Sequence, residues 1–265
     1  MGTLVSFHAH PDDESIQTGG TMAKAAADGH RVVLVLATRG EHGEVDDGFL
    51  EPGESLAERR TAETARSAEV LGAARVVYLD YLDSGMMDTP ENDAPGSFWK
   101  ADLDEAAERL AAVLREEQAD VLTIYDDHGG YGHPDHIQVH RVGTRAAQLA
   151  GTERVFEATT NRDHMRRILR LAAEAGELPL DEAPDESFID TLGSPEELIT
   201  ATIDVQRQVQ AKRASMAAHA SQISESSFFL QLPEEAFASS FGFEWYIRQG
   251  AAPGEHLDDL FGALH

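Results

Sequence analysis

The chain alternates between short apolar segments and longer segments in which apolar residues recur every three or four positions. The short runs are rich in Val, Leu and Ile and predict strands at residues 3–8, 32–37, 75–79, 121–125, 154–158 and 199–204. The longer segments have helical periodicity and predict helices at residues 15–28, 55–72, 101–118, 136–150, 161–175 and 205–222. In one of them the apolar residues are spaced four, three and four apart, at Leu103, Ala107, Leu110 and Leu114.

This alternation of strands and helices predicts an α/β fold. Strand–helix–strand connections produce a Rossmann-like, mainly parallel sheet with helices on both faces. In such sheets the active site lies beyond the C-terminal ends of the strands. We expect residues 1–265 to form a single domain, because no internal repeat or independent second core is evident.

Two parts of the second half of the chain have unusual compositions. Residues 177–198 carry eight acidic residues, three prolines and no basic residue, and predict an irregular acidic excursion. Eight of the eighteen aromatic residues lie beyond residue 227. They predict either the core of a C-terminal subdomain or one wall of a substrate pocket.

Composition and charge limit which molecules this protein can bind and which chemistry it can perform. The formal net charge is −27, from 21 basic and 48 acidic residues, and this excess repels nucleic acid and anionic membrane surfaces. The absence of Cys excludes disulfides and thiolate chemistry. We expect neither a signal peptide nor a membrane span, because residues 1–10 lack a basic start and a cleavage site and no apolar run approaches the roughly 18 residues that a span needs. We expect a cytoplasmic protein, and whether it forms a homo-oligomer stays open.

Candidate chemistry begins directly after the first predicted strand, in "FHAHPDDES" (7–15). His10 and Asp13 are three positions apart at a strand-to-helix turn, so an imidazole and a carboxylate can converge above the sheet. A second cluster, "YDDHGGYGHPDHIQVH" (125–140), follows another predicted strand. His10, Asp13 and one histidine from 133–136 would supply two nitrogens and one carboxylate with an open fourth position, the donor set of a catalytic zinc site.

The remaining polar residues of the two clusters can supply acid–base chemistry. Asp12 can take a proton from water activated by the metal. His133, held by Asp135, can stay protonated and stabilise an oxyanion or protonate a leaving amine. An isolated acidic turn usually caps a helix, and His8 fits a structural role in the strand. The prediction of a metal site therefore depends on the presence of two such clusters, each of which follows a predicted strand.

The two clusters resemble the PIG-L/LmbE-like zinc-dependent N-deacetylase family, which has the motifs "AHPDDE" (9–14) and "GHPDH" (132–136). The resemblance spans nearly the whole chain and includes "RGEHGEV" (39–45), "RRTAETARSAEVLG" (59–72), "YLDSGM" (81–86) and "KRASMAAHASQI" (212–223). The "DSGM" and "AHASQI" stretches are most similar to the mycothiol-pathway branch of the family. Residues 155–200 depart from that branch.

The resemblance implies a role for each matched residue. His10, Asp13 and His136 are implied zinc ligands, and Asp12 is the implied general base.

The other matched residues surround this centre. His133 is implied as an electrostatic or general-acid group with Asp135 orienting it, and Tyr131 as a contact of the reacting carbonyl. Three more residues align with sugar-contacting positions: Arg60, Asp83 and Glu44.

These observations predict a zinc-dependent hydrolase that removes an N-acyl group, most simply N-acetyl, from a small-molecule amino sugar or glycoside. The same donors also accept Fe²⁺, Co²⁺ or Mn²⁺. The alternatives are an amidase of a non-sugar or thiol-conjugate amide and a non-catalytic metal-binding protein. A two-metal phosphoesterase would need more ligands. A dinucleotide-binding protein would need a Gly-rich turn where this chain has "HPDDES".

The charge predicts a response to salt. Self-repulsion among 48 acidic and only 21 basic residues is screened as ionic strength rises. The melting temperature, measured by calorimetry in NaCl, should therefore rise between low salt and about 0.5 M. A flat or falling melting temperature across that range would contradict this prediction.

Overall fold

The computed structural model of the chain describes residues 1–175 and 186–262. Within these ranges one seven-stranded sheet forms the centre of the molecule. Its strands are β1 Thr3–His8, β2 Arg31–Leu36, β3 Arg75–Tyr78, β4 Val121–Tyr125, β5 Arg154–Thr159, β6 Ala201–Asp204 and β7 Phe243–Arg248.

The strand order is β3-β2-β1-β4-β5-β7-β6. Neighbouring strands from β3 to β5 are parallel, whereas β7 runs antiparallel to both β5 and β6. This arrangement confirms the predicted fold class, and all six predicted strands are present with boundaries shifted by at most two residues.

Strand β7 was not predicted from the sequence. It corrects the expectation that the C-terminal aromatic residues form the core of a C-terminal subdomain. Phe243, Trp245 and Tyr246 belong to β7 of the main sheet and not to a separate subdomain. The strand is difficult to recognise because one of its buried positions is the charged Glu244. Other aromatics, among them Phe237, do form a small cluster of their own outside the sheet.

Helices connect the strands and cover both faces of the sheet. The α-helices within the described residues are α1 Asp13–Gln17, α2 Gly19–Ala27, α3 Leu56–Val70, α4 Leu103–Glu116, α5 Gly129–Gly132, α6 Pro134–Ala150, α7 Arg162–Ala175, α8 Glu186–Ile189, α9 Val209–Ala218, α10 Phe228–Gln231 and α11 Glu234–Phe241. Short 3-10 turns occur at η1 Pro90–Asp93, η2 Phe98–Lys100, η3 Glu196–Leu198 and η4 Gln206–Gln208.

Two predicted helices are interrupted. The helix expected over 15–28 is divided at Thr18, whose hydroxyl lies 2.8 Å from His8 Nε2 at the end of β1. This contact also supports the structural role predicted for His8. The helix expected over 205–222 begins as a 3-10 turn and its α-helical part ends at Ala218.

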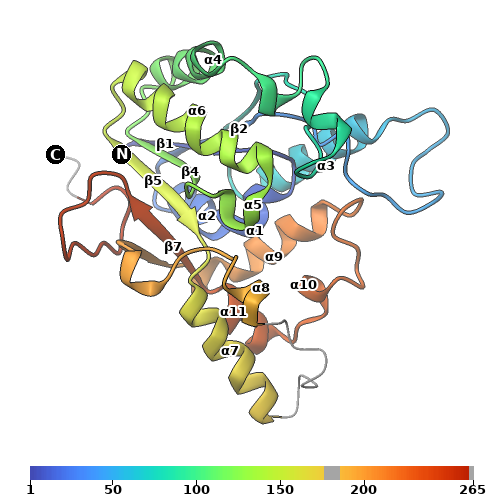
Figure 1. Cartoon of the computed structure of the whole chain (residues 1–265). Coiled ribbons are helices and arrows are strands. Elements are labelled where there is room, and N and C mark those ends of the chain that lie inside the picture. The colour runs from blue at the N-terminus through green and yellow to red at the C-terminus, as the bar shows by residue number, and fades with distance from the viewer. Residues whose placement is uncertain (176–185, 263–265) are drawn as a thin grey trace.

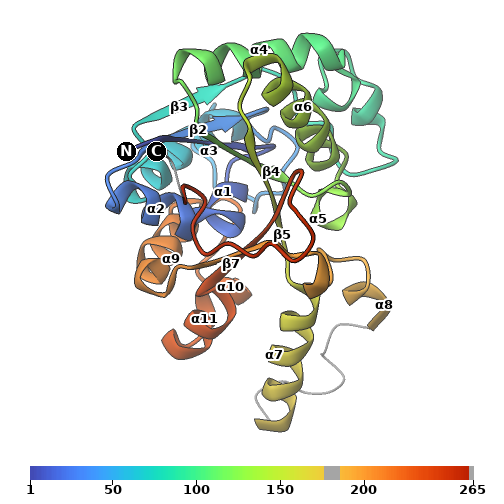
Figure 2. The same cartoon turned by 90° about the vertical axis from the view of Figure 1, so that its left-hand side faces the viewer.

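Alternate residues of each central strand face opposite layers. Val5 and Phe7 of β1 pack in a core with α4 and α6, whereas Leu4 packs on the other face in a core with α2 and α3. Figures 1 and 2 show α4 and α6 on one side of the sheet and α2 with α9 on the other.

This topology determines where a site can form. The strand order reverses direction between β1 and β4, which are adjacent and parallel. At such a switch point the connections leave the sheet in opposite directions and open a crevice at the C-terminal strand ends. Both clusters identified in the sequence follow these two strands.

Of the predicted acidic excursion at 177–198, residues 177–185 lie outside the described part, and the remainder contains α8 and η3. That the whole chain is one domain stays a prediction. Among the described helices, none is both long and apolar enough to cross a membrane.

Candidate active site

The first cluster is a tight turn between β1 and α1. The His10 backbone N–H donates to Asp13 Oδ2 at 2.9 Å, which closes the turn. Asp12, directly before α1, has φ 93° and ψ −33°. This conformation is uncommon for a residue with a Cβ and costs about 1–3 kcal/mol, so it persists only where surrounding contacts hold it.

The second cluster connects β4 to α6 through a glycine-rich loop. Gly129 has φ +69°, and a Cβ there would lie 2.6 Å from the Cβ of His136, so glycine is required. His133 is the N-cap of α6, and its Nδ1 accepts the Asp135 N–H at 3.1 Å. The first turn of α6 then places His136 in the interior, where it is 2% exposed.

The two clusters meet at the carboxylate of Asp13. Its Oδ2 lies 3.4 Å from His10 Nδ1, and its Oδ1 lies 3.3 Å from His136 Nε2. The structure therefore brings together the three residues predicted as metal ligands, with the carboxylate between the two imidazoles.

More carboxylates surround the other side of the His10 ring. His10 Nε2 lies 3.1 Å from Asp135 Oδ2 and 3.4 Å from Asp83 Oδ1. Burial alone lowers the pKa of His10, but hydrogen bonds to Asp13, Asp135 and Asp83 outweigh it and raise that pKa well above its usual range. The site thus has an excess of buried negative charge that favours a cation.

The residues present fit a divalent metal ion. Two groups of potential ligands have donor atoms within 4.8 Å of one another, and His10 belongs to both; one adds His133 and His136, the other Asp83 and Asp135. His136 Nε2 is buried and has no hydrogen-bond partner, and its Nδ1 lies 3.2 Å from the Gly129 carbonyl oxygen. Such a contact orients a metal-binding imidazole.

Asp12 is held by two buried side chains that are not ligands. Its backbone N–H donates to Glu14 Oε2 at 3.0 Å. Arg60 donates to the Pro11 and Gly40 carbonyls, and its Nη2 lies 3.3 Å from Asp12 Oδ2. Burial raises the pKa of Asp12 to about 6, against the opposing charge of Arg60. A carboxylate with this pKa is suited to accept protons near neutral pH.

Glu14 is in turn held by a residue from the far end of the chain. Its Oε1 lies 2.6 Å from His219 Nε2, and both residues are fully buried. The same oxygen accepts hydrogen bonds from Ser67 and Ser15. Burial alone raises the pKa of Glu14, but the His219 charge and these hydrogen bonds lower it to about 2.

Neither Glu14 nor His219 received a role from the sequence. Glu14 belongs to "AHPDDE" and His219 to "AHASQI", so the available signal was that each lies in a stretch matching the family. Their contact spans 205 residues and no local pattern indicates it.

The environment of His133 differs from the predicted one. The Asp135 carboxylate lies against His10 and accepts the Ser84 N–H, whereas only its backbone contacts His133. Burial, with the charges of His10 and His136, lowers the pKa of His133 to about 4. His133 is therefore neutral at pH 7. Because its Nδ1 accepts a hydrogen bond, the ring proton is on Nε2.

The other predicted residues lie around this centre. Tyr131 is 46% exposed, and its ring packs edge-on against His133 and His136. Glu44 is exposed on the loop after β2, and its carbonyl accepts a hydrogen bond from Gln222. Arg60 and Asp83 are buried and bonded to protein groups, so contact with a sugar stays a prediction for both.

Fold and site together define an α/β protein with a His/Asp metal-binding centre at the switch point of a mainly parallel sheet. The chain belongs to the PIG-L family, whose model, described as GlcNAc-PI de-N-acetylase, matches residues 5–147.

Curated relatives agree with this assignment over almost the full chain. A 1D-myo-inositol 2-acetamido-2-deoxy-alpha-D-glucopyranoside deacetylase from Streptomyces griseus is 41% identical and covers 98% of this chain and 88% of its own length. The deacetylase 1 of the same description from Catenulispora acidiphila is 39% identical, with 98% and 89% covered. Family membership confirms the predicted class of activity, metal-dependent removal of an N-acyl group from an amino sugar.

Solved structures support the fold. The N,N'-diacetylchitobiose deacetylase from Pyrococcus horikoshii has a TM-score of 0.60 at 19% identity, with 96% of this chain and 84% of that chain covered. GalB, the 4-carboxy-2-hydroxymuconate hydratase from Pseudomonas putida KT2440, has a TM-score of 0.61 at 17% identity, with 97% and 100% covered. Since one of these proteins is a hydratase, the likeness shows the fold alone.

The contacts of Glu14 predict the effect of Glu14→Gln. An amide has one oxygen, so either the Asp12 N–H or the His219–Ser67 donors lose their acceptor in the variant. We expect the free energy of unfolding to fall by about 1–3 kcal/mol and kcat to fall at least about tenfold through misplacement of Asp12, with bound metal retained.

Urea titration, metal analysis and steady-state kinetics measure these three effects. Glu69→Gln, on the exposed face of α3, is the matched control and should leave all three unchanged. Wild-type kcat in Glu14→Gln would show that Glu14 does not position Asp12.

Proposed function

We propose that this chain removes the acetyl group from an N-acetylglucosaminyl glycoside of inositol, using one zinc ion held by His10, Asp13 and His136. The substrate follows from the names of relatives that are 38–41% identical over nearly the whole chain. The observation that carries the proposal is the Asp13 carboxylate, which lies 3.4 Å and 3.3 Å from imidazole nitrogens of the two motifs. A cytoplasmic location stays a prediction from the sequence.

A metal held by these residues supplies a Lewis acid for the amide carbonyl and lowers the pKa of water. Asp12 accepts the proton of the water that attacks the carbonyl carbon. Its strained backbone and its contact with Arg60 hold the carboxylate beside the ligands. Its pKa of about 6 allows it to accept a proton at neutral pH and to release it afterwards.

His133 and Tyr131 are the residues that we assign to stabilisation of the oxyanion. The neutral His133 ring has its proton on Nε2 and can donate it as a hydrogen bond to the developing negative charge. The hydroxyl of Tyr131, whose side chain packs against His133 and His136, is the second donor. Because His133 is neutral, the proton for the leaving amine comes from Asp12 when the C–N bond breaks. One residue then serves as base and acid, and acetate and the free amine are the products.

The metal assignment predicts that His136→Ala loses the ion. Removal of one of three protein ligands leaves too few donors for tight binding. We expect elemental analysis to find about one zinc per wild-type chain and little in the variant. His256→Ala, at an exposed histidine far along the sequence from the motifs, should retain the wild-type amount. A full equivalent in His136→Ala would overturn the ligand set.

The catalytic assignment predicts that Asp12→Asn retains the metal but loses activity. An amide cannot accept a proton, and general base catalysis is worth roughly 10²–10⁴-fold. Primary-amine release from N-acetylglucosaminyl-inositol measures the rate, with zinc, Fe²⁺, Co²⁺ and Mn²⁺ each loaded in turn. Wild-type turnover in Asp12→Asn would show that Asp12 has only a structural role. Amine release only from acyl-peptides or thiol conjugates would contradict the proposal that the substrate is a sugar.

A further inference from the structure

The loop that carries Tyr131 has little conformational preference of its own. Three of its residues, Gly129, Gly130 and Gly132, have positive φ angles of 69°, 74° and 92°. Tyr131 lies between the last two, and its side chain is exposed. Glycine adopts such angles at low steric cost, but it loses more conformational freedom than any other residue when it is fixed. The position of the Tyr131 side chain therefore depends on contacts that other segments make with this loop.

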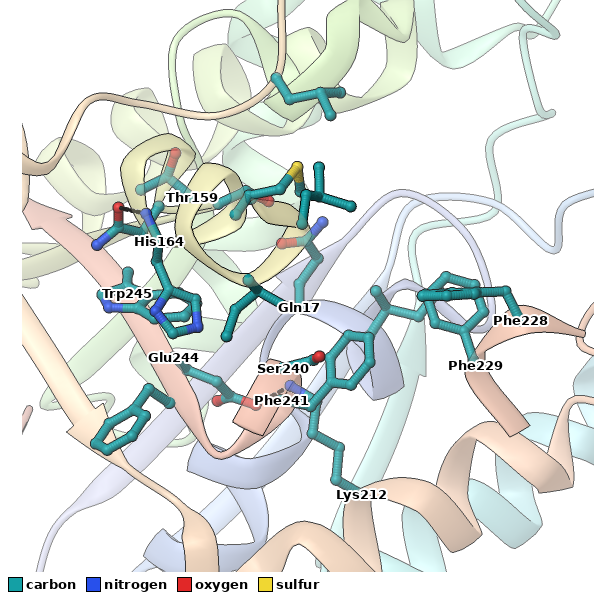
Figure 3. Close-up of a pocket in the computed structure, with 18 of the residues that line it drawn as sticks. Gln17, Thr159, His164, Lys212, Phe228, Phe229, Ser240, Phe241, Glu244 and Trp245 are labelled. Atoms are coloured by element: carbon teal, nitrogen blue, oxygen red, sulfur yellow. Dashed lines mark hydrogen bonds and ion pairs between the residues drawn. The ribbon is translucent and has the colours of Figure 1, made fainter. Parts of the chain in front are cut away.

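Asp126 makes the first of these contacts. It follows directly after β4, is 2% exposed, and its Oδ1 accepts the Gly130 N–H at 2.6 Å. Its Oδ2 accepts the Thr159 hydroxyl at 2.6 Å, and its backbone N–H donates to the Ala158 carbonyl at 3.2 Å. Thr159 is the last residue of β5 and also lines a cavity beside α1 (Figure 3). Asp126 thus joins the residue before Tyr131 to the ends of two central strands.

Gly193 makes the second contact, from another part of the chain. Its N–H donates to the Gly130 carbonyl at 2.8 Å. Gly193 has φ +46°, and a Cβ there would lie 2.1 Å from the Thr160 carbonyl oxygen, so glycine is required. Arg162 of α7 donates to the Gly193 carbonyl at 2.8 Å and holds this segment in place. The second contact therefore comes from outside residues 5–147, the part that the family model matches.

The two bonds together fix both backbone torsions of Gly130. Its N–H belongs to the peptide plane before its Cα and its C=O to the plane after it, so φ and ψ are the rotations between these planes. With both planes held, the direction in which the Tyr131 side chain leaves the loop is set. The Tyr131 ring lies edge-on, with its centroid 5.1 Å from that of His136 and 6.2 Å from that of His133.

The acidic residue next to Asp126 provides an internal comparison. Asp126 Oδ1 lies 3.3 Å from His128 Nδ1, and Asp127 Oδ1 lies 3.1 Å from the same nitrogen. Both carboxylates therefore contact His128, but the bond to the Gly130 N–H comes from Asp126. A substitution at each position separates the contact with the imidazole from the contact with the loop.

We propose that Asp126 and Gly193 are positioning residues for the reaction. They fix Gly130 from both sides and thereby hold the Tyr131 hydroxyl where the oxyanion forms. This inference rests on the proposed function, in which Tyr131 is an oxyanion donor. Such a donor acts on charge that develops only in the transition state, so its displacement lowers kcat and kcat/KM equally and leaves KM unchanged.

The test is a double-mutant cycle between Asp126→Ala and Tyr131→Phe, with N-acetylglucosaminyl-inositol as substrate. We expect Asp126→Ala alone to lower kcat at least about tenfold, with KM and bound zinc unchanged, because one oxyanion donor is displaced. In the Tyr131→Phe background the same substitution should cause no further loss, since the hydroxyl that it positions is absent. A general structural defect would lower kcat in both backgrounds.

Three further variants serve as controls. Asp126→Asn retains an oxygen for the Gly130 N–H and an amide that can donate to the Thr159 hydroxyl, so it should keep most of the wild-type kcat. Asp127→Ala removes the neighbouring carboxylate from His128 and should behave as wild type. Gly193→Ala repeats the cycle from the other side of the loop, and it replaces Asp126→Ala if that variant has a lowered melting temperature.

Three results would overturn the positioning role and leave the proposed function intact. These are equal losses in the wild-type and Tyr131→Phe backgrounds, wild-type kcat in folded Asp126→Ala and Gly193→Ala, or the same loss in Asp126→Asn as in Asp126→Ala. Wild-type kcat in Tyr131→Phe would overturn this inference together with the oxyanion role of Tyr131. Absence of amine release by the wild-type enzyme would overturn the proposed function and this inference with it.

Discussion

The tight turn between β1 and α1, which carries His10, Asp12 and Asp13, depends on the burial of the Glu14 carboxylate against His219. Two buried charges are costly to desolvate, and such a pair is stable only when the remaining hydrogen-bonding capacity of both groups is used. Glu14 meets this condition, because one oxygen accepts from His219, Ser67 and Ser15 and the other from the Asp12 backbone. On the other ring nitrogen of His219, Nδ1, the described residues supply no hydrogen-bond partner, so Glu14 provides the stabilisation of the pair. The left-handed conformation of Asp12 costs about 1–3 kcal/mol, and this set of charge-assisted hydrogen bonds offsets that cost.

The same turn explains why the site attracts a cation. Asp12, Asp13, Asp83 and Asp135 lie within one small buried region. Arg60 offsets only part of their charge, and its hydrogen bonds go to backbone carbonyls of the turn and the neighbouring loop. The structure therefore separates two tasks: Arg60 and Glu14 fix the geometry, and the remaining carboxylates and imidazoles are left with donor atoms for a metal.

Much of this arrangement could be predicted from the sequence, because parallel strands end at the same edge of a sheet. Because residues 3–8 and 121–125 read as strands, the sequence predicts the convergence of His10 with one histidine of 133–136, and the family resemblance selects His136. The contact between Glu14 and His219 could not be predicted from the sequence, because the two residues are 205 positions apart and no local pattern connects them. Strand β7 was missed because Glu244, buried to bind α2 and Lys212, interrupts its apolar pattern.

The C-terminal third of the chain links catalysis to specificity. The family model ends at residue 147 and includes both His/Asp motifs. His219, which holds Glu14 beside the turn between β1 and α1, lies beyond it. The sheet itself occurs also in a hydratase, so it cannot select the substrate. Residues 159–169 and 188–192, within the stretch that we expect to depart from the mycothiol-pathway branch, contribute lining residues to an apolar cavity beside α1. Differences in substrate among these proteins can therefore arise in this region without disturbing the metal centre, because the ligands that we propose, His10, Asp13 and His136, follow β1 and β4.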